Sequence, residues 1–169
     1  MFSSEKSFND VEKINLDEVV REIGDWNNST DVVKAGKIVV SRIKEYFENG
    51  VSFSQETTLC GNSILNNIKK ANELDYSIEM YYVGLANAEI AKERVRHRVH
   101  CGGHGISDED IERRYYESLI NMKTVIPMCD KALIYDNTDV FKRIAIYRYG
   151  ECVRHASILP EWFKSAMKL

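Results

Sequence analysis

Apolar positions along the chain alternate between short strand-like runs and longer segments in which apolar residues recur every three or four positions. A run at 11–16 leads into a helical pattern that ends at Gly24, and a longer helical pattern is stopped by Asn49-Gly50. The other strand-like runs are 51–59, 76–85, 132–135 and 140–149, the last being a final strand or part of a hairpin with the run before it. The other helical patterns are 64–71, 87–101, 107–127 and 160–167.

Strands that alternate with longer helices predict an α/β fold with a mostly parallel sheet and helices on both faces. The run Met80-Tyr81-Tyr82-Val83 shows little polar alternation, which predicts a strand covered on both faces. The chain has 169 residues, enough for one sizeable core, and no segment has the length or composition of a linker. We therefore expect a single domain that spans 1–169.

Charge and cysteine usage exclude several classes of function. The formal net charge is -3 and the sequence pI is about 5.9, so we expect neither nucleic acid nor an anionic membrane as a partner. The apolar runs are too short to span a bilayer, and the N-terminus lacks the apolar core of a signal peptide. Four dispersed cysteines without a Cys-x-x-Cys pair favour reduced thiols. These features predict a cytoplasmic protein.

Three of the predicted strands end on acidic residues, namely Asp17, Glu56 and Asp136. In open parallel sheets, ligands bind beyond the carboxyl ends of the strands. Carboxylates brought together there could orient Mg2+ or accept the proton of a hydroxyl nucleophile. Helix capping is the alternative, more so for Asp17 than for Glu56, because Asp commonly starts a helix after a strand, whereas Glu56 is not at an obvious cap position.

Four arginines flank a glycine break at Gly102-Gly103. Arg94 and Arg98 are four residues apart on one helical face, and Arg113-Arg114 lie in the next helical pattern. Folded as a hairpin, the segment 94–115 could act as a lid whose guanidinium groups bind phosphate oxygens. The alternative is a solvated face on which the arginines pair with nearby carboxylates.

Two further patterns are less specific. His97, His100, Cys101 and His104 would share a face only if the helix continued through the two glycines, so we assign no metal site. A phosphate loop has the pattern Gly-x-x-x-x-Gly-Lys-Ser/Thr, but the only Gly-Lys is Gly36-Lys37, inside a predicted helix. The main anchor for the phosphates of a nucleotide is therefore not found.

Several stretches together resemble one family, the zeta-toxin-like P-loop kinases, in particular the bacterial branch labelled predicted ABC-type ATPase. They follow the order of that family over roughly residues 12 to 138, which is more specific than any single motif. The matching stretches are Ile14–Glu18, Ser52–Leu59, Tyr82–Leu85, Arg94–Val99 with Gly102–His104, Ile111–Tyr115 and Ile134–Thr138.

The resemblance implies an ATP- and Mg2+-dependent phosphotransferase on a P-loop kinase-like three-layer sandwich. Zeta toxins proper phosphorylate a UDP-N-acetylamino sugar, so the implied acceptor is a hydroxyl of a small molecule. By position, Asp17 looks like the base for that hydroxyl, and Glu56, Thr57 and Thr58 look like the residues on the substrate side.

The basic residues also have counterparts in the family. Arg98, with Arg113 or Arg114, looks like the arginines that bracket the phosphates. Neighbours on a helix point about 100° apart, so the sequence leaves open which of the last two faces the site. Arg94 and Asp136-Asn137 look like residues on the nucleotide side.

The sequence departs from the family at its start. Relatives begin with a strand, the phosphate loop and a helix, whereas 1–10 is expected here to be only the tail of that helix. The central strand and phosphate loop are thus expected to be missing, which predicts low stability or a rearrangement, and impaired activity. The alternative function is a noncatalytic truncated remnant, an interaction module that binds an antitoxin or a full-length partner.

Overall fold

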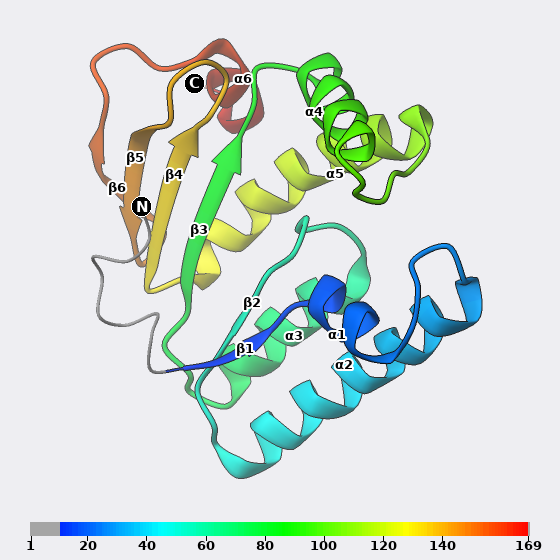
Figure 1. Ribbon diagram of the computed structural model, residues 1–169. Coiled ribbons are helices and arrows are strands. Elements are labelled where there is room, and N and C mark those ends of the chain that lie inside the picture. Colours follow the sequence, from blue (N-terminus) through cyan, green and yellow to red (C-terminus); the bar gives the residue numbers. More distant parts are fainter. Residues whose placement is uncertain (1–10, 169) are drawn as a thin grey trace. The chain divides into compact units, whose positions relative to one another are not determined.

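The strands of the chain form two separate sheets in the computed structural model, which describes residues 11–168 (Figure 1). The chain divides into two compact units, of which the first ends at Thr57 and the second begins at Thr58. The predicted α/β class is confirmed, because both units combine helices with strands. The expected helix tail at 1–10 lies outside the described residues. In the described part of the chain, no helix combines the length and the apolar character needed to cross a membrane.

The first unit has a parallel sheet of two short strands, β1 (Glu12–Ile14) and β2 (Phe53–Gln55), paired from Glu12↔Phe53 to Ile14↔Gln55. Between them in the chain lie α1 (Leu16–Ile23) and α2 (Ser29–Asn49). The two helices pack through a small apolar cluster built on Val19, Val20 and Ala35.

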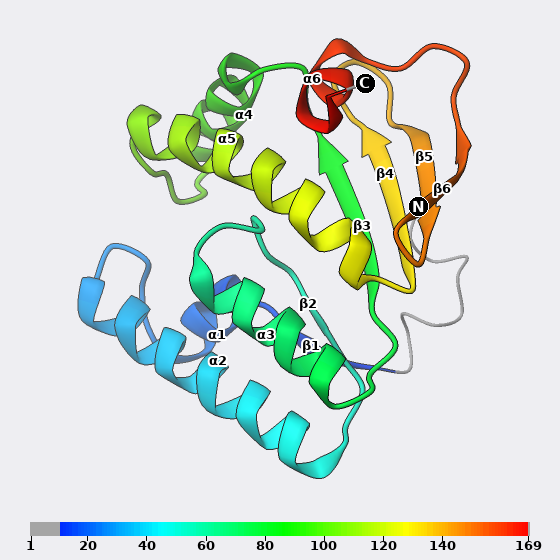
Figure 2. The same cartoon turned by 180° about the vertical axis from the view of Figure 1, so that it is seen from behind.

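The second unit has a mixed sheet in the order β3-β4-β5-β6, in which β3 and β4 are parallel and the other neighbours are antiparallel. Its longest helix, α5, lies over one face of this sheet (Figures 1 and 2). The strands are β3 (Glu79–Gly84), β4 (Lys131–Asp136), β5 (Lys142–Arg148) and β6 (Glu151–His155). The helices are α3 (Asn62–Glu73), α4 (Ala88–His100), α5 (Asp108–Val125), the short 3-10 helix η2 (Ile126–Met128) and α6 (Glu161–Met167).

The core of the second unit forms where α5 and α6 meet the central strands. Met122 of α5 and Phe163 of α6 are almost fully buried, and they belong to the same cluster as Ala132 and Ile134 of β4. Burial of this apolar surface is the main force that holds the unit together.

Several predicted helix ends are confirmed by their caps. Helix α2 ends at Asn49, and Gly50 adopts a left-handed conformation (φ 65°) while its N–H bonds the carbonyl of Tyr46. Ser107 caps α5, since its hydroxyl accepts a hydrogen bond from the N–H of Asp110 at 3.2 Å.

The prediction that the Met80–Val83 run is covered on both faces is wrong. Strand β3 is an edge of its sheet, and Val83 is 41% exposed. Met80 and Tyr82 pack on the core, whereas Tyr81 faces polar partners: its hydroxyl donates to Glu79 at 2.8 Å and the Lys131 ammonium lies over its ring. The side chains of β3 do alternate between the two faces of the sheet. The sequence pattern does not show this, because Tyr and Val both count as apolar residues.

The chain also contains a strand that the pattern did not predict. Strand β6 is exposed at all five positions, so it has no apolar face that periodicity could detect. The two-residue turn Tyr149-Gly150 defines it instead, with φ of 50° and 80°. Two positive φ values at the centre of a tight hairpin turn are typical of type I′.

Candidate functional site

The first unit brings two of the predicted acidic residues to the carboxyl ends of its paired strands. Glu56 directly follows β2, and its N–H donates to the carbonyl of Ile14 at 3.1 Å. The Asn15 side-chain amide donates to the Glu56 carboxylate at 2.6 Å. Asp17 lies in the first turn of α1, two residues beyond Asn15. Parallel pairing therefore places Asp17 and Glu56 at one edge, as predicted from the sequence.

The capping alternative for Asp17 is wrong, because Asn15 caps α1. The Asn15 side-chain oxygen accepts a hydrogen bond from the N–H of Asp17 at 2.8 Å. The Asp17 side chain makes no hydrogen bond or ion pair with the residues described, and it is half-buried. Its carboxylate is thus available for chemistry. Sequence reasoning missed Asn15, although an Asn just before a helical pattern is a capping signal.

The remaining substrate-side residues lie where the two units join in the chain. Thr57 is the last residue of the first unit and Thr58 is the first residue of the second. Both are exposed. Their predicted role stays a prediction.

The second unit brings together the three residues predicted on the nucleotide side. The Arg94 guanidinium, on α4, donates to the carbonyl of Asn137 and, at 3.2 Å, to that of Thr138. Asn137 follows β4, and its own N–H donates to the carbonyl of Gly84 at the end of β3. Arg94 therefore fixes α4 against the loop after β4.

Two other arginines of the lid segment are neutralised by carboxylates. Arg96 forms an ion pair with Asp108, and Arg113 pairs with Asp110 at 2.8 Å and with Glu117 at 2.9 Å. The solvated-face alternative describes these residues well. Arg113 thus lies on an exposed face with its guanidinium already occupied.

Arg98 and Arg114 differ from these neighbours. Neither guanidinium makes a hydrogen bond or an ion pair with any residue in 11–168. Arg114 is half-buried, whereas Arg113 is exposed. The structure therefore distinguishes Arg113 from Arg114, which the sequence could not. The guanidinium of Arg114 keeps its N–H donors available for an anion.

The glycine break shapes the surroundings of Arg98. Helix α4 ends at His100, and Gly102 has a φ of 87° that favours glycine, so the helix stops as predicted. The N–H of Gly103 donates to the Arg98 carbonyl, and a Cβ at Gly103 would lie 2.7 Å from Arg98 Cγ. Within the described residues, no three His, Cys, Asp or Glu side chains are grouped so that they could hold a metal.

A buried lysine joins the two helices of the lid segment. Lys92 is 8% exposed, and its ammonium forms ion pairs at 2.7 Å with Glu89 of α4 and Glu112 of α5. The hydrogen bonds that the ammonium donates to Glu112 and Glu89 raise the pKa of Lys92. No sequence pattern marked this residue, because one of its partners lies on the other helix.

At the end of β4, the Asp136 carboxylate is bound by other groups of the fold. Its side chain is buried and accepts hydrogen bonds from the Thr138 N–H and hydroxyl and from the Trp162 indole N–H at 3.2 Å, with Lys142 at 3.6 Å. Burial alone would raise the pKa of Asp136, but these hydrogen bonds and the Lys142 charge lower it overall.

Asp136→Asn should therefore destabilise the second unit at neutral pH by about 1.5–3 kcal/mol, the usual range for hydrogen bonds to a charged group. A carboxyl whose pKa is lowered by folding stabilises above its unfolded pKa, about 3.9, and this stabilisation is lost as pH falls through the lower folded pKa. The stability gap to wild type should close below about pH 4 in urea titrations followed by circular dichroism. Asp139→Asn, an exposed neighbour, is the matched control, and an equal effect there would contradict the assignment.

Fold and site together define an α/β protein with available carboxylate and guanidinium groups at its strand and helix ends. An uncharacterised protein of Haemophilus influenzae is 30% identical to the chain over 102 residues, which is 60% of this chain and 73% of that protein. The chain belongs to the same family as that protein. No protein-family model matches the chain, and no solved structure matches it significantly.

Proposed function

We propose that the chain is the phosphate-handling part of a zeta-toxin-like P-loop kinase that uses ATP and Mg2+. The proposed acceptor is a hydroxyl of a small molecule such as a UDP-N-acetylamino sugar. One observation carries the proposal. On α4 and α5, Arg96 and Arg113 are paired with carboxylates, whereas Arg98 and Arg114 have no such partner among residues 11–168.

The electrostatics of these arginines favour an anionic ligand. A guanidinium carries five N–H donors in a planar fork that matches the oxygens of a phosphate group. Arg98 and Arg114 keep this capacity, since no described carboxylate competes for it. Lys92 forms ion pairs with Glu89 of α4 and Glu112 of α5. These ion pairs hold together the two helices that carry the arginines. Phosphoryl transfer is catalysed mainly by electrostatic stabilisation of the transferred group, which guanidinium groups can supply.

We assign the loop after β4 to the nucleotide side of the proposed site. Arg94 ties α4 to the carbonyls of Asn137 and Thr138, and the Asp136 carboxylate is saturated within the fold. We propose that Asp136 and Arg94 shape this loop, and that the exposed groups around Asn137 contact the nucleotide.

The proposed base is Asp17. The Asp17 carboxylate has no partner among the described side chains, and Glu56 is held in place by Asn15. A carboxylate at the end of a strand can accept the proton of an attacking hydroxyl. In the proposal, Asp17 takes this proton and Glu56 orients the acceptor.

Affinity for ATP is expected to be weak. Gly36-Lys37 lies in the middle of α2, where its backbone N–H groups are used by the helix and cannot cradle a phosphate. With arginines as the main phosphate ligands, we expect a Kd of about 1 mM or higher, equivalent to about -4 kcal/mol.

Titration of the chain with ATP and Mg2+ by NMR tests the proposal. Ring signals of His97 and His100, the neighbours of Arg98 on α4, should shift saturably. The absence of any saturable shift would contradict the proposal. Saturable binding without transfer to any hydroxyl acceptor would favour the noncatalytic alternative.

A further inference from the structure

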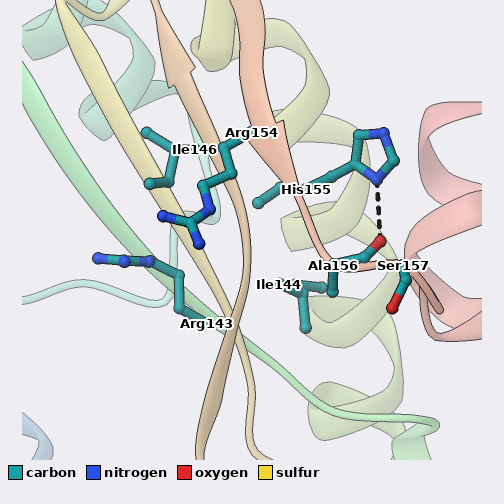
Figure 3. Close-up of a pocket in the computed structure, with 8 residues that line it drawn as sticks. Arg143, Ile144, Ile146, Arg154, His155, Ala156 and Ser157 are labelled. Carbon is teal, nitrogen blue, oxygen red and sulfur yellow. Dashed lines mark hydrogen bonds between the residues drawn. The ribbon is translucent and has the colours of Figure 1, made fainter.

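The hairpin of β5 and β6 carries a pocket of about 340 Å³ that the proposed kinase chemistry does not use. It is lined by residues of both strands and of the segment after β6, and Arg143 and Arg154 supply its charged groups (Figure 3). Ile146 and Ala156 add apolar surface, whereas the Ile144 side chain is buried in the core. The pocket lies wholly in the second unit.

Two arginines on neighbouring strands create a local excess of positive charge. Ile146 pairs directly with Arg154 across the two strands, and the Arg143 and Arg154 guanidinium groups extend to the same side of the hairpin in Figure 3. Neither guanidinium forms an ion pair or a hydrogen bond with a residue that the structure describes. Like charges on the same side of a hairpin repel each other, so an anion bound between the two guanidinium groups would relieve that repulsion.

The register irregularity of the hairpin contributes to this arrangement. The pairing of β5 with β6 shifts between Ile146 and Tyr147, and that of β4 with β5 shifts between Ile134 and Tyr135. Such bulges redirect side chains at the edge of a sheet. Beyond the end of β6, the Ala156 N–H still bonds the Ile144 carbonyl at 2.8 Å, which keeps the backbone at the base of the pocket in place.

We propose that this pocket binds the phosphate group of a small phosphorylated molecule between Arg143 and Arg154, with the body of the ligand against Ile146. Two forked guanidinium groups suit a tetrahedral dianion with several acceptor oxygens. The volume is at the lower end of the range for small-molecule sites. The net charge of -3 on the chain does not favour an extended polyanion such as nucleic acid. The site is independent of the proposed kinase function.

The test follows the side-chain Nε–Hε NMR signals of Arg143 and Arg154 during titration with inorganic phosphate and with phenyl phosphate. Each signal is assigned by its loss in the corresponding alanine variant. Both signals should shift saturably, with phenyl phosphate binding at least as tightly as phosphate. Arg143→Ala and Arg154→Ala should each weaken binding about ten-fold or more, because each removes charge-assisted hydrogen bonds.

Arg148→Ala is the matched control, since Arg148 is an exposed arginine of the same strand that does not line the pocket. This variant should change affinity by less than about two-fold, as expected for an exposed charge outside the site. Three results would overturn the proposal: no saturable shift, an equal loss in Arg148→Ala, or equally tight binding of acetate. Because the His97 and His100 signals report on α4 separately, failure here and failure of the kinase proposal are distinguishable.

Discussion

Replacing Gly84 by alanine is expected to lower the free energy of unfolding of the second unit by about 3 kcal/mol, at the upper end for overpacked cores. A Cβ at Gly84 would lie 2.2 Å from Cη2 and 2.5 Å from Cζ2 of Trp162. Neither the Gly84 backbone nor the Trp162 ring can easily move. The Gly84 carbonyl accepts from the Asn137 N–H, and the buried indole donates to Asp136. Urea unfolding followed by circular dichroism measures the loss.

Two further variants test whether the contact with Trp162 is the cause. Gly105→Ala is the matched control, because a Cβ there meets only one methyl group of Val99, an exposed side chain that can rotate. In Gly84→Ala/Trp162→Phe the indole atoms that the new Cβ would meet are absent. The double variant should therefore lose less unfolding free energy than the sum of the losses in the two single variants. Strict additivity would mean that the contact with Trp162 is not the cause.

Asp17→Asn is expected to reduce phosphoryl transfer by at least about a hundred-fold, the range for loss of a general base. The amide keeps the shape of the side chain but cannot accept the proton of the acceptor hydroxyl. Since Asn15, not Asp17, caps α1, the substitution should leave the helix and the stability of the first unit nearly unchanged. Transfer from ATP to a UDP-N-acetylamino sugar can be followed by 31P NMR at millimolar ATP.

The adjacent Glu18→Gln serves as the control for charge, because Glu18 is an exposed residue of the same helical turn. It should retain the transfer rate of the wild-type chain. Equal rates in wild type and Asp17→Asn would contradict the assignment of the base. No transfer by the wild-type chain would contradict catalysis by this chain and favour an interaction module.

Much of the fold follows from local signals in the sequence. The stop at Asn49-Gly50 and the cap at Ser107 were predictable because a left-handed glycine and a capping hydroxyl satisfy specific backbone groups. Strand β6 was not, since it is exposed along its length and depends on the Tyr149-Gly150 turn. Periodicity detects burial, and an edge strand without a buried face carries no such signal.

The candidate site was predictable only as far as residue type. The sequence placed arginines on two helices with acidic residues nearby, and spacing alone allowed every one of them to be paired. Which arginines are neutralised depends on rotamers and on contacts between helices: Asp110 and Glu117 of the same helix occupy Arg113, whereas Arg114 has no partner among residues 11–168. The burial of Lys92 between α4 and α5 is likewise a tertiary property.

A comparison of two double variants tests the central claim, that Arg98 and Arg114 bind the phosphates of ATP. Arg98→Ala/Arg114→Ala and Arg96→Ala/Arg113→Ala remove the same charge from the same two helices. NMR titration with ATP and Mg2+ should show affinity at least about ten-fold weaker in the first variant and within about two-fold of wild type in the second. Equal affinity in the two double variants would contradict the claim.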